Sequence, residues 1–143
     1  MKIWSTVKKA LGSVKYRYKK KKHGLTFPLY CKIHGVKHSH YQGALAQSQE
    51  QDKLQIVHTP TQKYPYNVYV YSVTLNRVLG YLHKDLSKKL VKVFGKGFCR
   101  DALIKNLTGG RAVGYKYLGC NIQILESMRH MIDEEDFLYL HGV

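Results

Sequence analysis

Between residues 27 and 126, hydrophobic and polar positions alternate in several short segments, which is the pattern of half-buried β-strands. Strands are predicted over 29–34, 54–58, 66–75, 78–82, 98–108 and 115–126. In the last of them, Cys120, Ile122 and Ile124 share one side of the strand. Asn76-Arg77 and Gly109-Gly110 are predicted to form turns between neighbouring strands.

Two internal segments follow a helical period instead. Residues 39–49 suit a short helix with Tyr41, Ala44 and Leu45 inward. In residues 84–94, apolar side chains recur every four positions, and lysines occupy the opposite face. The inward residues are Leu86, Leu90 and Phe94, and the outward ones are Lys88, Lys89 and Lys92.

The predicted order is strand, helix, three strands, helix and two strands, which is neither a βα repeat nor an all-helical pattern. It favours a mostly β, α+β domain: a small antiparallel barrel of OB-like or SH3-like type with inserted helices. We predict three regions, a basic tail at 1–26, the barrel at 27–126 and an acidic C-terminal helix or tail at 127–143.

Charge is distributed unevenly over these regions. The chain has 24 Lys and Arg against 9 Asp and Glu, a net charge of +15. Residues 1–49 carry +11 without any acid, whereas residues 126–143 carry −4. Such an excess indicates an anionic partner, either nucleic acid, an anionic lipid surface or an acidic protein.

The basic tail combines an amphipathic helical pattern over 2–14 with a run of adjacent lysines that ends at Lys22. Because neighbouring lysines repel one another, we predict that this run is flexible. Tyrosines in it could stack on bases while the cations contact phosphates. The candidates are Tyr16, Arg17, Tyr18, Lys19, Lys20, Lys21 and Lys22. The alternatives are a solubilising tail and a helix on an anionic membrane surface.

The three cysteines are too few and too scattered for a disulfide framework. The N-terminus lacks the continuous apolar stretch of a secretory signal, and no apolar run approaches the roughly 18–20 residues that cross a bilayer. We therefore expect a cytoplasmic protein without a transmembrane segment.

Cys31, His34, His38 and His40 have a spacing that superficially resembles a zinc site. On a strand, however, Cys31 and His34 point to opposite faces, and Cys31 suits a buried position. A metal-dependent hydrolase acting on nucleic acid is thus the alternative function. Nucleotide-loop and serine-elbow motifs are absent and the core lacks a local carboxylate cluster. We expect no catalysis and no cofactor.

Tyrosines are concentrated in and near the predicted strand at 66–75. Tyr69 and Tyr71 share one face of this strand, opposite Val68 and Val70. Either face could be the buried one. If the tyrosines face solvent, their rings could stack on unpaired bases; otherwise they are core rings whose hydroxyls reach the surface.

Four segments in order resemble the HIRAN domain, a small module found alone in bacteria and attached to ATPases of DNA repair and fork remodelling. The segments are Gly35-Val36-Lys37-His38, Asp52-Lys53-Leu54-Gln55-Ile56-Val57, Tyr64-Pro65-Tyr66-Asn67-Val68-Tyr69-Val70 and Leu79-Gly80-Tyr81-Leu82-His83-Lys84-Asp85-Leu86. The resemblance covers residues 33–126, and the last of the four segments is the most specific.

The resemblance implies an OB-like barrel that binds single-stranded DNA and holds a free 3′-OH end, within a larger repair or replication assembly or alone. By position in the motifs, the pocket falls on Lys37, His38, Tyr66 and Asn67. Three of these differ in type from the family's Arg, Tyr and Asp, and Tyr66 matches. The expected function is nucleic-acid binding, with single-stranded DNA favoured and RNA as an alternative.

Overall fold

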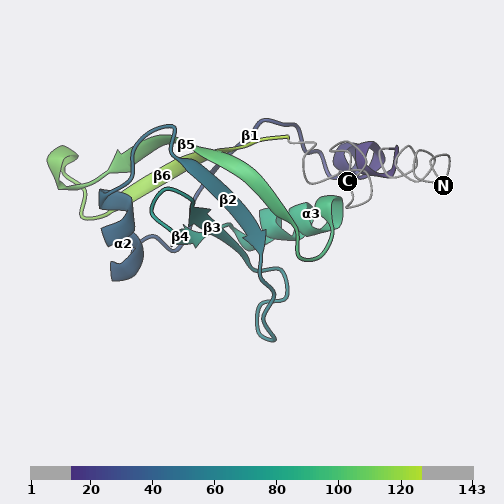
Figure 1. The fold of residues 1–143 in the computed structure, drawn as a ribbon, viewed down its shortest axis with the longest axis horizontal. Coiled ribbons are helices and arrows are strands. Elements are labelled where there is room, and N and C mark those ends of the chain that lie inside the picture. The colour runs from purple at the N-terminus through teal and green to yellow at the C-terminus, as the bar shows by residue number, and fades with distance from the viewer. Residues whose placement is uncertain (1–13, 127–143) are drawn as a thin grey trace, which may run out of the picture.

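The computed structural model describes residues 14–126, so the predicted helix over 2–14 and the acidic segment at 127–143 lie outside the described residues, apart from Val14. The described chain forms one antiparallel sheet of six strands in the order β1-β6-β5-β2-β3-β4 (Figure 1). The strands are β1 (Leu29–Lys32), β2 (Lys53–His58), β3 (Val68–Ser72), β4 (Arg77–Tyr81), β5 (Cys99–Gly109) and β6 (Leu118–Ile124). Helix α2 (Ser39–Ala46) follows β1, α3 (Lys84–Phe94) follows β4, and the short 3₁₀ helix η1 (Arg111–Val113) lies between β5 and β6.

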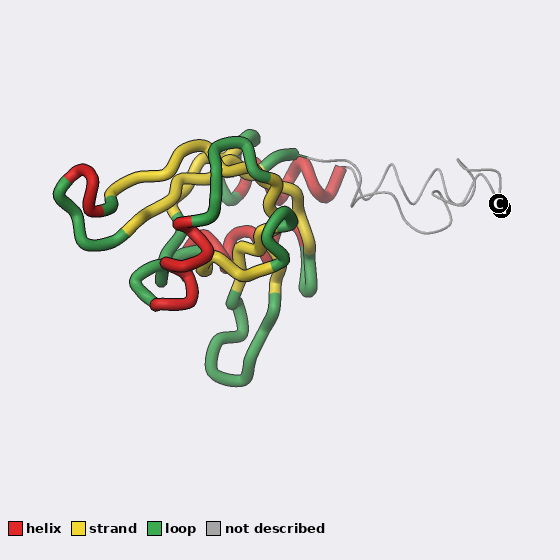
Figure 2. The backbone as a smooth tube through the Cα atoms, turned by 60° about the vertical axis from the view of Figure 1, so that its left-hand side comes forward, coloured by secondary structure: helices red, strands yellow, loops and turns green. Residues whose placement is uncertain are grey.

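The sheet curls until its two edge strands meet. Just beyond β1, His34 forms an isolated bridge with Tyr81 at the end of β4. The His34 N–H donates to the Tyr81 carbonyl at 2.8 Å, and the Tyr81 N–H donates to the His34 carbonyl at 3.1 Å. The curvature is visible in the strands of Figure 2. An α+β fold with a barrel-like antiparallel sheet is therefore confirmed.

The concave side of the sheet forms the core. Alternation buries Val68 and Val70 in β3, Leu54 and Ile56 in β2, and Ile122 in β6. Other large side chains that are fully buried are Ile33, Leu45, Leu79, Leu90, Ile104, Ile124 and Cys120. The two helices lie toward opposite ends of the curled sheet (Figure 1), so that α2 contributes Leu45 and α3 contributes Leu90.

Helix α3 has the predicted bounds and an exposed lysine face. The strand predicted at 66–75 is shorter than expected, because its first residues belong to a loop. There the Asn67 N–H donates to the Tyr64 carbonyl rather than to a neighbouring strand. The following turn occupies residues 73–76 instead of Asn76-Arg77, since Asn76 adopts a positive φ of 55° and Arg77 already begins β4.

The prediction of a flexible lysine run was wrong for the described residues. Residues 14–22 are helical, and this N-terminal helix packs on the barrel. The Tyr16 side chain is 7% exposed, and its ring stacks on Phe94 of α3 with centroids 5.8 Å apart. On the same side of the helix, the Lys20 ammonium forms an ion pair with Glu126 at 2.9 Å. Helix geometry turns the adjacent lysines to different sides, which reduces their mutual repulsion.

This helix ends in a defined way at Gly24. The Leu25 N–H donates to the Lys20 carbonyl at 3.0 Å and the Gly24 N–H to the Lys21 carbonyl at 3.1 Å, the pair of bonds that forms a Schellman motif. Gly24 has a φ of +66°, which a residue with a side chain rarely adopts. Leu25 is buried next to it in the hydrophobic core, which fixes the end of the helix against the barrel.

A cation lies within the aromatic contact between the helix and the barrel. The Arg100 guanidinium is 4.0 Å from the centre of the Phe94 ring and 5.9 Å from that of Tyr16, and the residue is 3% exposed. Burial, reinforced by the Glu126 carboxylate, raises the pKa of Tyr16 to about 12. Tyr16 is therefore an anchor of the N-terminal helix and not an exposed stacking residue.

Candidate nucleic-acid interface

A cluster of aromatic rings lies on the convex, solvent-facing side of the sheet at the point where it closes. Tyr69 of β3 is paired with Tyr81 of β4, and Tyr81 is bridged to His34, so that these three side chains share one face. We call this cluster the tyrosine–histidine face. Its residues are His34, Tyr41, Tyr69, Tyr81 and His83.

Two members of this face belong to the helices: His83 is the N-cap of α3, and Tyr41 lies in the first turn of α2. The rings of His83 and His34 have centroids 5.2 Å apart. Tyr41 of α2 lies near Tyr69 and Tyr81, and burial together with these phenols raises the pKa of Tyr41. Sequence reasoning missed His34, Tyr41 and His83 as partners, because only the closure of the sheet brings them together.

The face remains accessible to solvent. Tyr81 is 41% exposed, and Tyr69 is half-buried, whereas the valines on the other side of β3 are fully buried. The choice that the sequence left open is thus settled, with the tyrosines outside. Burial and the neighbouring His83 and Lys32 lower the pKa of His34, so near neutral pH it presents a neutral ring.

Lys37 and His38 lie at one end of this face, in the segment between His34 and α2. The Lys37 ammonium is 5.7 Å from the centre of the Tyr117 ring, which precedes β6. His38 is the exposed N-cap residue of α2, and its ring stacks on that of His40 at 5.4 Å. Both side chains therefore point to solvent, as a binding role requires.

Tyr66 and Asn67 lie in the loop between β2 and β3 that projects from the strands (Figure 2). Tyr66 is 37% exposed, and the Lys88 ammonium of α3 lies 5.7 Å from its ring centre. The Asn67 side-chain amide donates to the Thr59 carbonyl at 3.2 Å and so closes the base of the loop. Within residues 14–126, no hydrogen bond or ring contact joins this pair directly to Lys37 and His38. The pair of Lys37 and His38 contacts the face, since the rings of His38 and Tyr41 have centroids 5.7 Å apart.

His58 holds this loop in place. It is 5% exposed; its Nδ1 accepts the Gly97 N–H at 2.8 Å, and its Nε2–H therefore donates to the Pro65 carbonyl, also at 2.8 Å. The ring is thus a neutral tautomer that connects the Tyr66 loop to the loop after α3.

Replacing His58 by phenylalanine keeps the ring but removes both hydrogen bonds. We expect a loss of about 1–2 kcal/mol in the free energy of unfolding, measured by urea denaturation. The exposed His40, changed to Gln as a control, should stay within about 0.5 kcal/mol of the wild type. Equal stability of His58→Phe and wild type would show that the two hydrogen bonds of His58 do not stabilise the loop.

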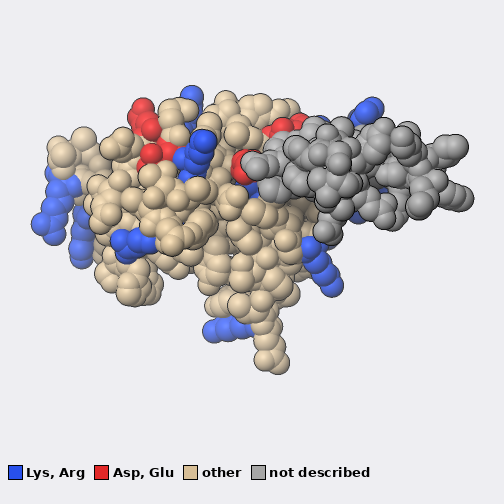
Figure 3. Space-filling model, viewed as in Figure 1, with Lys and Arg blue, Asp and Glu red and all other residues tan. Residues whose placement is uncertain are grey.

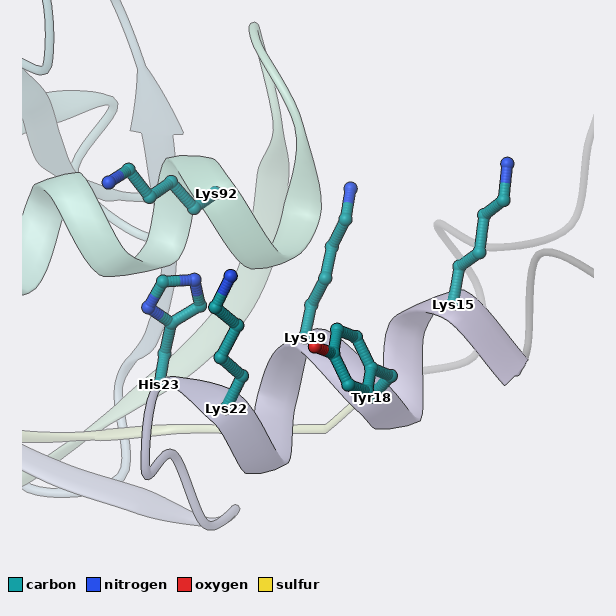
Figure 4. Close-up of a pocket in the computed structure, with 6 residues that line it drawn as sticks. All are labelled: Lys15, Tyr18, Lys19, Lys22, His23 and Lys92. Atoms are coloured by element: carbon teal, nitrogen blue, oxygen red, sulfur yellow. The ribbon is translucent and has the colours of Figure 1, made fainter.

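A second surface lies between the N-terminal helix and α3. Lys15, Lys19 and Lys22 recur at i, i+4 and i+7 and extend from the same side of the helix (Figure 4). With α3 they enclose a shallow hollow of about 490 Å³, which we call the cationic groove. Its lining residues are Lys15, Tyr18, Lys19, Lys22, His23 and Lys92.

The groove contains four lysines and no carboxylate among its lining residues. Of the seven tail residues predicted to contact nucleic acid, Tyr18, Lys19 and Lys22 line it, whereas Lys20 is paired with Glu126. Arg17 and Lys21 are exposed outside the lining, and Tyr16 is buried, so the prediction that Tyr16 stacks on bases was wrong. Lysine and arginine side chains also project at several places on the face shown in Figure 3, including its left-hand end.

The weak zinc-site candidates do not converge. Cys31 is packed against the core, and burial raises the pKa of its thiol to about 12, which disfavours the thiolate that binds metal. His34 contacts His83, while His38 and His40 stack on each other at α2. Within residues 14–126, no three His, Cys, Asp or Glu side chains are grouped as metal ligands would be.

For the membrane alternative, the structure bears only on spanning helices. In the part of the chain that the structure describes, no helix combines the length and apolar character needed to cross a bilayer.

The chain was also compared with known proteins. No family model matches it, and neither the curated proteins nor the solved structures contain a match. The fold and the two surfaces described above are therefore the observations from which function is inferred.

Proposed function

We propose that this protein is a non-catalytic nucleic-acid-binding module of the HIRAN type with an OB-like barrel, and that single-stranded DNA is its preferred ligand. The observation that carries this proposal is the tyrosine–histidine face, an accessible row of rings formed where the curled sheet closes. Rings in such a row can stack on successive unpaired bases, each with about 1–3 kcal/mol.

Exposed cations near the face could contact the phosphates of a bound strand. Lys37 follows His34 by three residues and lies over the Tyr117 ring, and Lys88 follows His83 by five residues and lies over the Tyr66 ring. A single strand whose bases stack on the face would thus meet positive charge nearby. Stacking supplies sequence-tolerant affinity, and the lysines contact phosphates.

The proposal extends to an exposed 3′ end. Tyr66 is the residue that matches the family's pocket in type, and its ring is open to solvent. Asn67 donates through its amide nitrogen to the loop, so its side-chain oxygen is the acceptor for a 3′-hydroxyl. Without a carboxylate, this hydrogen bond is weaker than a charge-assisted one, so we expect preference for the end and not strict dependence.

Fluorescence anisotropy with matched single-stranded oligonucleotides, ending in 3′-OH or 3′-phosphate, tests both parts. We expect submillimolar binding of single strands and several-fold weaker binding of the 3′-phosphate form. In Tyr66→Ala the two oligonucleotides should bind alike. Equal binding of both by the wild type would remove the end pocket, and absence of single-strand binding at low salt would overturn the proposed function.

A further inference from the structure

The cationic groove is built from a docked helix and not from a flexible arm. The same helix that buries Tyr16 against Phe94 and pairs Lys20 with Glu126 carries its other lysines on the opposite, open side. Tyr18 is 66% exposed at the groove. The charges are thus held in fixed relative positions by core contacts that lie outside the groove.

The spacing of the lysines fits a phosphate backbone. Residues at i, i+4 and i+7 extend over about 10 Å of helix axis. The stripe from Lys15 to Lys22 therefore presents three cations in a row to consecutive phosphates of one backbone, and Lys92 adds a fourth charge from the facing helix. A ligand with a single phosphate could not contact all of these lysines at once.

We propose that the cationic groove is a second nucleic-acid site, which binds about three consecutive backbone phosphates without reading bases. The inference rests on the proposed function. It assigns the phosphate contacts and the base stacking, which both contribute to affinity, to two different surfaces. The groove provides the salt-dependent, sequence-independent part, and the tyrosine–histidine face provides the stacking part. The partner class is a nucleic-acid backbone; an anionic lipid surface shares the phosphate chemistry and is separated from it by the experiment.

The test neutralises the groove and measures the dependence of affinity on salt. Each lysine that contacts a phosphate of a single strand contributes about 0.7 to the slope of log K against log salt. The triple variant Lys19→Gln, Lys22→Gln, Lys92→Gln should therefore flatten the slope by about 2 and weaken binding about 100-fold at 0.1 M salt. A matched control removes three exposed lysines outside the lining, Lys21, Lys53 and Lys105, and should change the slope by less than about 0.5.

Several outcomes overturn the inference. If the groove and control variants change the slope equally, general charge and not the groove binds the backbone. If the groove variant keeps its slope for DNA but no longer floats with anionic vesicles, the groove is a lipid site. Failure of the proposed single-strand preference is distinguishable, because groove-dependent backbone binding would then remain while single strands bind no better than duplex of equal length.

A second pair of variants separates a rigid groove from a polycationic arm. Tyr16→Ala keeps every lysine but removes the ring that docks the helix, and it should flatten the slope about as much as the lysine variant does. Tyr16→Phe keeps the ring and should bind like the wild type. An unchanged slope in a folded Tyr16→Ala protein would contradict the rigid groove; if that variant does not fold, the surface lysine variants decide.

His23 gives the groove a pH signature. It faces Lys19 and Lys22 from its own helix and Lys89 and Lys92 from α3; its partial desolvation and these cations lower its pKa below the ordinary 6.5. It is therefore neutral at pH 7. A bound phosphate favours the protonated ring, so binding takes up a proton and strengthens as the pH falls toward the pKa of His23.

We expect affinity to rise several-fold between pH 7.5 and about 5.5, and His23→Gln to remove much of this rise. Burial also lowers the pKa of His34 on the tyrosine–histidine face, so the pH effect is taken as the difference between wild type and His23→Gln. Identical pH profiles for the two proteins would show that phosphate does not bind beside His23.

Discussion

Replacing Gly80 by alanine is expected to cost about 3 kcal/mol in the free energy of unfolding, the largest stability effect that we predict for a single methyl group. A Cβ at Gly80 would lie 2.5 Å from Cγ2 of Ile33 and 2.6 Å from the carbonyl oxygen of His34. Ile33 can change rotamer, but the His34 carbonyl is backbone and is bonded to the Tyr81 N–H. The added methyl group therefore forces open the bridge that closes the sheet.

The measurement is urea or thermal denaturation of the purified variant. We expect the midpoint of thermal unfolding to fall by about 10 °C. Gly43→Ala is the matched control. Gly43 lies in α2, and the atom nearest to an added Cβ would be Nη2 of Arg77, at 4.0 Å. Because glycine is a poor helix former, this control should gain about 0.5–1 kcal/mol. Equal stability of Gly80→Ala and wild type would show that closure at His34 does not contribute to the fold.

Tyr81→Ala should weaken single-strand binding by about 10-fold to 100-fold, because the ring lies at the centre of the tyrosine–histidine face and one stacked base is worth about 1–3 kcal/mol. The slope of log K against log salt should stay unchanged, since no cation is removed. This pattern is the reverse of that expected for the groove lysines, which are expected to change the slope.

Tyr30→Ala provides the control for this substitution. Tyr30 is 57% exposed on β1, with Lys105 near its ring, and it lies outside the face. It should bind single strands within about twofold of the wild type. Two results would contradict the assigned face. One is that both substitutions weaken single-strand binding equally, and the other is that the loss of affinity in Tyr81→Ala disappears at high salt.

Local chemistry in the sequence was sufficient for most of the elements. The alternation of Cys120, Ile122 and Ile124 predicted β6 and its buried side, because a strand with one face in the core alternates with period two. The four-residue period of Leu86, Leu90 and Phe94 predicted α3 with its bounds. The antiparallel class followed from the order of these elements and their short connections.

The same reasoning was wrong where a long-range contact outweighed local repulsion. The lysine run at 19–22 indicates a flexible chain if it is considered alone. The aromatic ring of Tyr16, stacked on Phe94 some 80 residues away in sequence, supplies the burial that docks the helix. A signal was present in the spacing of Lys15, Lys19 and Lys22 on one helical face, yet its meaning depends on a partner helix that the spacing cannot specify.

What the sequence by itself determined is the set of strands and helices, and the basic character of the chain. Only the tertiary structure decided that the tyrosines of β3 face solvent, that His34 meets Tyr81 and His83, and that Tyr16 is buried. The physical reason is that periodicity reports which residues share a side of one element, whereas burial depends on which elements cover that side. Here this is fixed by sheet closure and by the docked helix, both made by residues far apart in the chain.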